Sequence, residues 1–238
     1  MITTVVFDLD DTLYDEVEYC RSGFEAVAEF VARPSWPCWH GLEARVTRLP
    51  SGRISGAFWK QFTAGNRTKT FNAALGELGI RYDDKLIGEL IKVYRNHVPK
   101  ITLPQDSRDL LSQLSGKYTL ALLTDGFLPA QQLKVQALGI EKYFKCTVYT
   151  EQLGREFWKP SPAGFQKLMQ TLNARPETIA YVADNEKKDF IAPNKLGFLT
   201  IRIIRPAGLY SESSQESGAA AQYTIRQISR LPAFLEKL

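Results

Sequence analysis

Acidic residues that could carry out covalent chemistry follow the first apolar segment of the chain. Asp8 and Asp10 lie in the stretch Asp8-Leu-Asp-Asp-Thr12, directly after an apolar run that ends at Phe7. Once the chain turns beyond a strand, two carboxylates at this spacing can both face one crevice. One could attack an electrophile while the other transfers a proton, which is the division of labour that covalent catalysis requires. The pair is informative because it comes after a buried strand.

The elements that must position these residues can be read from hydrophobic patterning. Nearly continuous apolar runs predict buried parallel strands at residues 3–7, 118–123, 179–183 and 200–204. The first three end in polar residues: Asp8, then Thr124 with Asp125, then Asp184 with Asn185. Helical patterns separate the later strands, at 107–114, 129–138 and 162–172. This alternation predicts an α/β fold with a Rossmann-like open parallel sheet, whose ligand site lies at the carboxyl ends of the strands.

Residues 15–98 show a helical period and no convincing β run. We therefore predict an inserted α-helical cap domain at 15–98, placed after the first strand of a core formed by 1–14 and 99–238. In the last part of the core, the stretch 210–221 is rich in Ser, Glu, Gly and Ala and predicts a surface loop. A short edge strand at 223–225 and a closing helix from Leu231 are expected after it.

Composition restricts the class of protein. A chain of 238 residues with 44% hydrophobic and 24% charged residues can bury a sizeable core and is typical of globular proteins. No apolar stretch approaches the roughly 20 residues that span a bilayer, and the first apolar run is interrupted by Asp8, so neither a membrane protein nor a signal peptide is expected. The formal charge of +4 does not by itself indicate nucleic acid as a partner. Three widely spaced cysteines (Cys20, Cys38 and Cys146) predict reduced thiols and a cytoplasmic location.

Four motifs in order make the sequence resemble the haloacid dehalogenase superfamily, in particular its phosphatase branch with a helical cap after the first motif. The family pattern DxDxT is matched by Asp8, Asp10 and Thr12, and its Ser or Thr at the end of the second core strand by Thr124. Its Lys, often followed by Pro, is matched by Lys159, and its DxxxxD pair by Asp184 and Asp189. The resemblance covers essentially the whole chain.

The resemblance implies a role for each matched residue. Asp8 would attack phosphorus, and Asp10 would protonate the leaving alkoxide and later deprotonate water. Thr124, with backbone N–H groups near Gly126, would hold the phosphoryl oxygens, and Lys159 would offset their charge. The metal site would comprise Asp8, the backbone carbonyl of Asp10, Asp184 and a supporting Asp189.

Electrostatics independently favours a cation. Two carboxylates about 4 Å apart repel by about 4 kcal/mol at an effective dielectric constant near 20. A dianionic phosphate that arrives among such groups increases the repulsion. A hard divalent ion with oxygen ligands relieves it, and Mg²⁺ commonly bridges carboxylates and phosphate. Mg²⁺ is therefore the expected cofactor.

The sequence departs from the family pattern at Asp125, where Asn is usual. Its carboxylate could bond a substrate hydroxyl or ammonium, or it could discourage some anions. The fourth motif is preceded by Ala183 where Gly is common, a small change.

Several residues near these motifs could instead have structural roles. Asp11 is expected to point away and form turn contacts. Lys159 could be a solvated lysine, and Asp189 could stabilise a helix N-terminus. Asn185 could contact phosphate or cap a turn. His97, like His40, has no partner spacing and favours a packing or surface role.

Other reactions on the same fold compete with phosphate monoester hydrolysis. Asp10 argues against a dehalogenase, because the dehalogenase reaction has no leaving alkoxide that needs a proton. A phosphonatase with a cap lysine (Lys60 or Lys69) or a phosphomutase stays open. A non-enzymatic phospho-receiver module is a remote alternative, since receivers are shorter and have no helical insertion.

A basic stretch in the expected cap suggests a hypothesis about substrate. Between residues 45 and 69 the chain has six basic residues and no acidic one: Arg45, Arg48, Arg53, Lys60, Arg67 and Lys69. Some could face the crevice and favour a leaving group with extra negative charge; the alternative is a solvated basic face. The expected partner is a small-molecule phosphate ester, a sugar phosphate or a nucleotide, with a slight preference for sugar phosphates. A monomer or homodimer is expected.

Overall fold

The computed structural model describes residues 1–33, 49–209 and 218–237. The chain divides into two compact units. One, which we call the core, comprises Met1–Val17 with Ile101–Leu238, and the other, the helical unit, comprises Glu18–Lys100. Among the described residues, no helix combines the length and the apolar character that crossing a bilayer requires.

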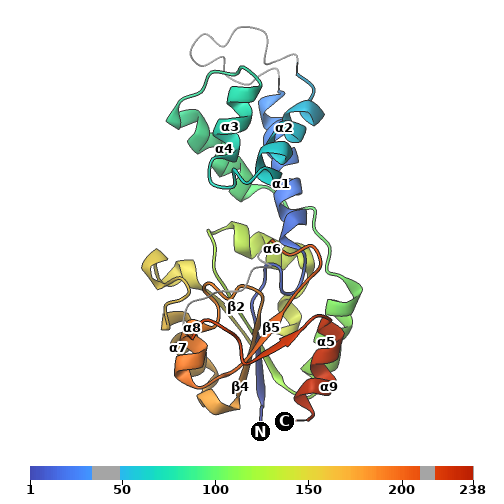
Figure 1. The fold of residues 1–238 in the computed structure, drawn as a ribbon, viewed down its shortest axis with the longest axis vertical. Helices are drawn as coiled ribbons and strands as arrows, with labels where there is room; N and C mark the ends of the chain where they lie inside the picture. Colours follow the sequence, from blue (N-terminus) through green and yellow to red (C-terminus); the bar gives the residue numbers. More distant parts are fainter. Residues whose placement is uncertain (34–48, 210–217, 238) are drawn as a thin grey trace. The chain divides into compact units, whose positions relative to one another are not determined.

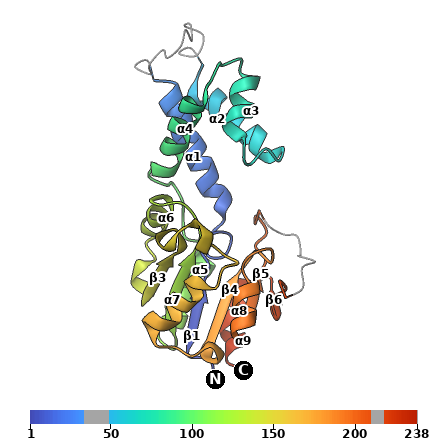
Figure 2. The same ribbon diagram turned by 90° about the vertical axis from the view of Figure 1, so that its left-hand side faces the viewer.

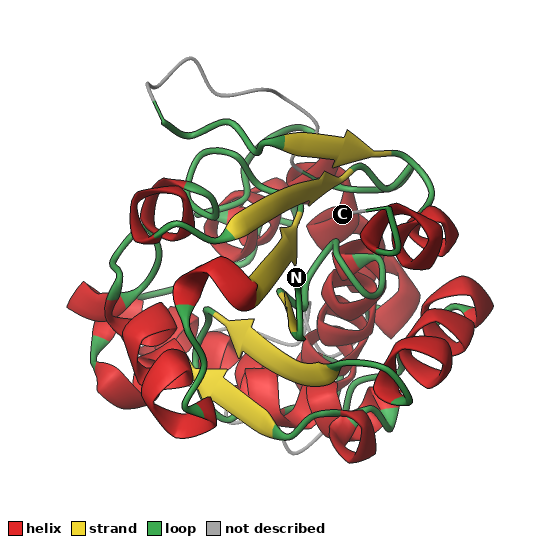
Figure 3. Ribbon diagram, turned by 90° about the horizontal axis from the view of Figure 1, so that it is seen from below, coloured by secondary structure: helices red, strands yellow, loops and turns green. Residues whose placement is uncertain are grey.

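The core contains a six-stranded sheet in which every neighbouring pair of strands is parallel (Figures 1 and 3). The strand order is β3-β2-β1-β4-β5-β6. The bounds are β1 (Thr4–Phe7), β2 (Thr119–Thr124), β3 (Cys146–Tyr149), β4 (Ile179–Ala183), β5 (Leu199–Ile203) and β6 (Tyr223–Ile225). The open parallel sheet predicted from the sequence is confirmed, and each predicted strand agrees with an observed one to within one residue at either end.

Strand β3 was not predicted. Only Val148 of its four residues is buried, so the segment has no continuous apolar run. Its strand conformation depends on pairing with β2, where Leu123 lies opposite Val148 and Thr124 opposite Tyr149. Such pairing is a tertiary contact, which a local sequence pattern does not report.

Helices accompany the sheet on both sides, with α5 and α9 on one side and α7 and α8 on the other (Figure 1). Their bounds are α5 (Gln105–Ser115), α6 (Ala130–Leu138), α7 (Ala163–Leu172), α8 (Ile191–Leu196) and α9 (Leu231–Leu235). Short 3-10 turns occur at Glu141–Tyr143, Thr150–Leu153, Arg155–Phe157, Pro176–Thr178 and Ile228–Arg230. The predicted helices at 107–114, 129–138 and 162–172 correspond to α5, α6 and α7.

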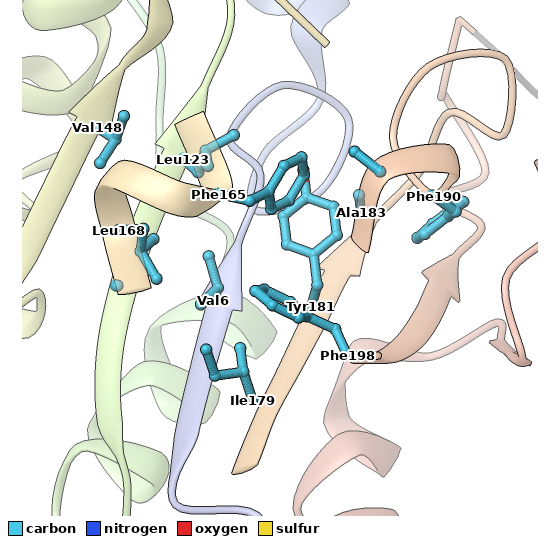
Figure 4. Packing of buried hydrophobic residues seen from close by; sticks show 12 residues of the cluster. Val6, Leu123, Val148, Phe165, Leu168, Ile179, Tyr181, Ala183, Phe190 and Phe198 are labelled. Atoms are coloured by element: carbon cyan, nitrogen blue, oxygen red, sulfur yellow. The ribbon is translucent and has the colours of Figure 1, made fainter. Parts of the chain in front are cut away.

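Side chains that alternate along the strands form the core packing. In β4, Ile179, Tyr181 and Ala183 point to one face, where they meet Phe165 and Leu168 of α7 (Figure 4). The intervening residues of β4 are equally buried. Both faces of β4 are therefore covered, which explains why this strand is a continuous apolar run.

The helical unit contains α1 (Glu16–Val31, whose first residues belong to the core), α2 (Ser51–Thr63), α3 (Thr70–Glu77) and α4 (Asp84–Asn96) (Figure 2). No strand occurs among its described residues. Its helices pack around an aromatic cluster of Phe24, Phe58, Phe62, Phe71 and Tyr94. His97 is buried beside this cluster, with Nδ1 2.6 Å from the Tyr94 carbonyl oxygen and Nε2 3.0 Å from Ser22 Oγ. Its predicted packing role is confirmed, whereas His40 lies outside the described residues.

Candidate active site

Three neighbouring strands bring the predicted residues to one edge of the sheet. Phe7, the last residue of β1, lies opposite Leu122 of β2 and Val182 of β4. The polar residues at or directly after the ends of these strands, namely Asp8, Thr124 and Asp184, are therefore close neighbours at the carboxyl end of the sheet. All three are buried.

Lys159 joins two of the acidic residues. Its Nζ lies 2.7 Å from Asp8 Oδ1, 2.6 Å from Asp189 Oδ1 and 3.1 Å from the Tyr181 hydroxyl. The lysine side chain is only 1% exposed, so the alternative of a solvated lysine is wrong. Burial lowers the pKa of Lys159, but the charges of Asp189 and Asp8 outweigh it and hold that pKa well above its usual value.

An all-oxygen cluster surrounds Asp8. One carboxylate oxygen from each of Asp8, Asp184 and Asp189 lies within 4.8 Å of the others. Burial raises the pKa of Asp8 to about 6 against the opposing charge of Lys159, and burial with repulsion from Asp189 and Asp8 raises the pKa of Asp184 to about 9. Hard oxygen donors and uncompensated negative charge are the features that suit Mg²⁺. These residues fit a divalent cation.

Asp189 is held by several groups at once. Its Oδ2 accepts a hydrogen bond from the Asn185 backbone N–H at 3.0 Å, while Oδ1 meets Lys159 and, at 3.8 Å, Lys188. Burial raises the pKa of Asp189, but the two lysines reverse this effect, and the pKa lies below its usual value. Asn185 Oδ1 accepts from the Lys187 N–H at 3.0 Å, the turn contact expected as one of its two alternatives.

The carboxylate of Asp10 belongs to a separate network. Lys134 Nζ lies 2.8 and 2.9 Å from its two oxygens, Gln131 Nε2 donates to Oδ2 at 2.8 Å, and the Tyr14 hydroxyl donates to Oδ1. Burial raises the pKa of Asp10, but the charge of Lys134 and these hydrogen bonds together lower it below its usual value. Glu16 lies 3.9 Å from Lys134, and burial with repulsion from Asp10 raises the pKa of Glu16 to about 8.

The sequence reasoning missed Gln131, Lys134 and Tyr14. Gln131 and Lys134 are one helical turn apart on α6, but they lie 121 and 124 residues from Asp10 in the chain. What marks Gln131 and Lys134 as site residues is their burial on one face of α6. Burial is not visible in the sequence.

The end of β2 and the turn after it hold the other predicted residues. Thr124 Oγ1 accepts a hydrogen bond from Gln131 Nε2 at 2.8 Å. Asp125 Oδ1 accepts from Thr150 Oγ1 at 2.7 Å, and its carboxylate accepts from the Lys159 N–H at 3.2 Å and meets Lys188 Nζ at 3.7 Å. Gly126 has φ +137°, a conformation that side chains rarely allow.

Asp11 stabilises the loop that follows β1. Its carboxylate accepts from the backbone N–H groups of Glu16 at 2.8 Å and Leu209 at 2.6 Å. Its φ is +51°, so the chain turns sharply at this residue. The predicted turn role of Asp11 is confirmed.

Two further observations concern residues outside this cluster. Trp158, which precedes Lys159, donates from Nε1 to Glu151 Oε2 at 3.0 Å and packs edge-on against Phe127. In the basic stretch, Arg45 and Arg48 lie outside the described residues. Lys60 of the helical unit forms an exposed ion pair with Glu77, and Arg67 lies over the ring of Phe62. The hypothesis that this stretch faces the crevice stays a prediction.

Comparison with known proteins identifies the family of the chain. The family model of haloacid dehalogenase-like hydrolases matches residues 2–197. The chain is 28% identical over 213 residues to a glyceraldehyde 3-phosphate phosphatase of Methanopyrus kandleri, covering 86% of this chain and 85% of the relative. It is 23% identical to N-acylneuraminate-9-phosphatase of Homo sapiens, covering 100% and 95%.

Solved structures share the fold at low sequence identity. The HAD-hydrolase YfnB of Bacillus subtilis, bound to magnesium, superposes with a TM-score of 0.69 at 21% identity over 98% of each chain. L-2-haloacid dehalogenase of Xanthobacter autotrophicus superposes with a TM-score of 0.62 at 18% identity over 100% of each chain. The fold is thus an α/β fold of the Rossmann-like type. The chain belongs to the haloacid dehalogenase-like hydrolase family, as its four motifs predicted.

Proposed function

We propose that this protein is a Mg²⁺-dependent phosphatase that hydrolyses a small phosphate monoester through a phospho-aspartate at Asp8. The observation that carries the proposal is the separation of two aspartates, the buried Asp8 and the half-buried Asp10, into different networks. Asp8 is paired with Lys159 beside the oxygen cluster, while Asp10 is bonded to Lys134, Gln131 and Tyr14. One carboxylate is thereby suited to attack and the other to proton transfer.

The groups around Asp8 would support attack on phosphorus. An Asp8 oxygen forms a bond to phosphorus as the ester P–O bond breaks, and Lys159 offsets charge on the transferring group. Thr124 and backbone N–H groups near Gly126 would orient the phosphoryl oxygens. Asp8, Asp184 and the backbone carbonyl of Asp10 would hold Mg²⁺, with Asp189 in support. The cation would offset the charge of the carboxylates and the phosphate.

The substrate is proposed from the relatives. Their names specify glyceraldehyde 3-phosphate, N-acylneuraminate 9-phosphate and phosphoglycolate as the compounds on which those proteins act. We therefore favour a phosphorylated sugar or sugar acid over a nucleotide. We take the helical unit to be the cap expected from the sequence, and a reducing cytoplasm to be the location, since Cys20 and Cys146 are free thiols.

Hydrolysis of p-nitrophenyl phosphate with and without Mg²⁺ tests the proposal. We expect metal-dependent turnover, with kcat lowered by about four orders of magnitude in Asp8→Asn because the nucleophile is lost. Asp109→Asn, an exposed carboxylate on α5, is the matched control and should retain full activity. A hydroxylamine-labile phosphoryl group should be trapped on the wild type and absent from Asp8→Asn. Turnover that survives in Asp8→Asn would refute the nucleophile.

A further inference from the structure

Two polar side chains of helix α6, a glutamine and a lysine, are buried instead of being exposed to solvent. Gln131 is 2% exposed and Lys134 4% exposed. The ammonium group of a lysine is costly to remove from water unless it is paired. Here the contacts of Lys134 Nζ with both oxygens of Asp10, and its approach to Glu16, offset that cost. The ion pair with Asp10 therefore accounts for the burial of Lys134.

Gln131 connects Asp10 to the turn after β2. Its Nε2 lies 2.8 Å from Asp10 Oδ2, 2.8 Å from Thr124 Oγ1 and 2.5 Å from the Asp125 carbonyl oxygen. Lys134 and Gln131 approach Asp10 from the same helix, three residues apart, so they act from one face. The Asp10 carboxylate is consequently fixed relative to Thr124, the residue proposed to hold the phosphoryl oxygens.

We propose that Lys134 and Gln131 are positioning residues that hold the Asp10 carboxylate at the orientation needed for its two proton transfers. This inference rests on the proposed phosphatase function. In the first transfer, the Asp10 carboxyl gives its proton to the ester oxygen as the bond between that oxygen and phosphorus breaks. In the second, the Asp10 carboxylate accepts a proton from water while the water oxygen attacks phosphorus and the bond from phosphorus to Asp8 breaks. Neither residue contacts phosphorus or exchanges these protons itself.

Leaving-group dependence distinguishes positioning from a general structural role. A p-nitrophenolate ion leaves readily without a proton, whereas phenolate and above all benzyl alkoxide require one. The parameter kcat/KM includes steps only through formation of the phospho-aspartate, so it reports the first proton transfer alone. Misplacing Asp10 should therefore reduce kcat/KM for benzyl phosphate strongly and for p-nitrophenyl phosphate weakly.

The experiment compares Lys134→Met, Gln131→Met and the control Lys167→Met, an exposed lysine of α7, on p-nitrophenyl, phenyl and benzyl phosphate. In Lys134→Met we expect kcat/KM to fall about 10- to 100-fold for benzyl phosphate and at most about threefold for p-nitrophenyl phosphate. The kcat for p-nitrophenyl phosphate should nevertheless fall, with phospho-aspartate accumulating, because the second transfer always needs the base. Lys134→Arg should recover part of the loss, and Lys167→Met should behave as wild type.

Three results would overturn the inference while leaving the proposed function intact. They are an equal loss of kcat/KM on all three esters, no loss on any, or a further loss when Lys134→Met is added to Asp10→Asn. A further loss in the double variant would show that Lys134 acts by a route that does not involve Asp10. If Lys134→Met does not fold, Gln131→Met, which leaves the charges intact, is judged by the same leaving-group criterion. Failure of the proposed function would be seen separately, as a wild type with no Mg²⁺-dependent turnover or an active Asp8→Asn.

Discussion

At the scale of single residues, Asp125 shows how the family pattern is altered in this chain. The sequence left open whether its carboxylate bonds a substrate group or discourages anions. In the structure the carboxylate faces Thr150, the Lys159 N–H and Lys188, and it is 7% exposed. These contacts are within the protein. Its negative charge is therefore expected to act on phosphate by repulsion and by holding Lys188.

Replacing Asp125 with Asn should tighten the binding of phosphate. An Asn side chain can still accept from Thr150 and the Lys159 N–H, while one negative charge is removed and Lys188 is released. One charge about 4 Å from phosphate would contribute about 1 kcal/mol in bulk water and more at a buried site. The inhibition constant for inorganic phosphate should therefore fall at least about fivefold. Lys188→Met should raise that constant. Weaker phosphate inhibition in Asp125→Asn would show that the carboxylate helps to bind the substrate.

The sequence predicted those site residues that lie in short motifs, and it missed those that act across the fold. Asp8, Thr124, Lys159 and Asp184 each follow or precede a recognisable element, so their convergence could be predicted from strand order. Lys134 carries no such signal, because a lysine in a helix is ordinarily solvated. Lys134 belongs to the site because it contacts Asp10, which follows β1, and this contact depends on tertiary structure.

At the scale of elements, the junction of β2 and α6 joins the phosphate-binding turn to the acid–base residue. A Cβ added to Gly126 would lie 2.9 Å from Cγ and Cδ of Gln131, which is too close. The positive φ of Gly126 adds strain for any other residue. The glycine therefore allows Gln131 to reach both Asp10 and Thr124.

Gly126→Ala is expected to damage stability and activity together. Strain at a positive φ costs about 1–3 kcal/mol, and displacement of Gln131 should lower kcat/KM for benzyl phosphate more than for p-nitrophenyl phosphate. Urea unfolding gives the change in the free energy of unfolding. Gly116→Ala, at the end of α5 with φ −81° and nothing within 4 Å of the added Cβ, is the control and should change it by less than about 0.5 kcal/mol. Equal effects of the two substitutions would contradict this account of the junction.

At the scale of the whole molecule, the buried carboxylates link stability to pH and to the cation. Without a cation, the pKa of Asp8 is raised to about 6 and that of Asp184 to about 9. The folded state then binds more protons than the unfolded state between the ordinary and the raised values. The stability that these two carboxylates contribute at low pH is therefore lost as the pH rises through this window.

Mg²⁺ should reverse this loss, and its effect should grow with pH because it competes with protons for the same oxygens. At a concentration about 100 times Kd, a bound ligand stabilises by about 2.7 kcal/mol, or about 5–10 °C in Tm for a chain of this size. We expect a Tm increase of this order near pH 8.5 and a much smaller one near pH 5.5, measured by calorimetry against NaCl of equal ionic strength. Asp184→Asn removes both a ligand and a buried ionisable group, so it should abolish the Mg²⁺ effect and reduce the loss of stability of the cation-free protein at high pH. A Tm increase that is independent of pH, or equal in Asp184→Asn, would place the cation elsewhere and remove the electrostatic reason for assigning it to this cluster.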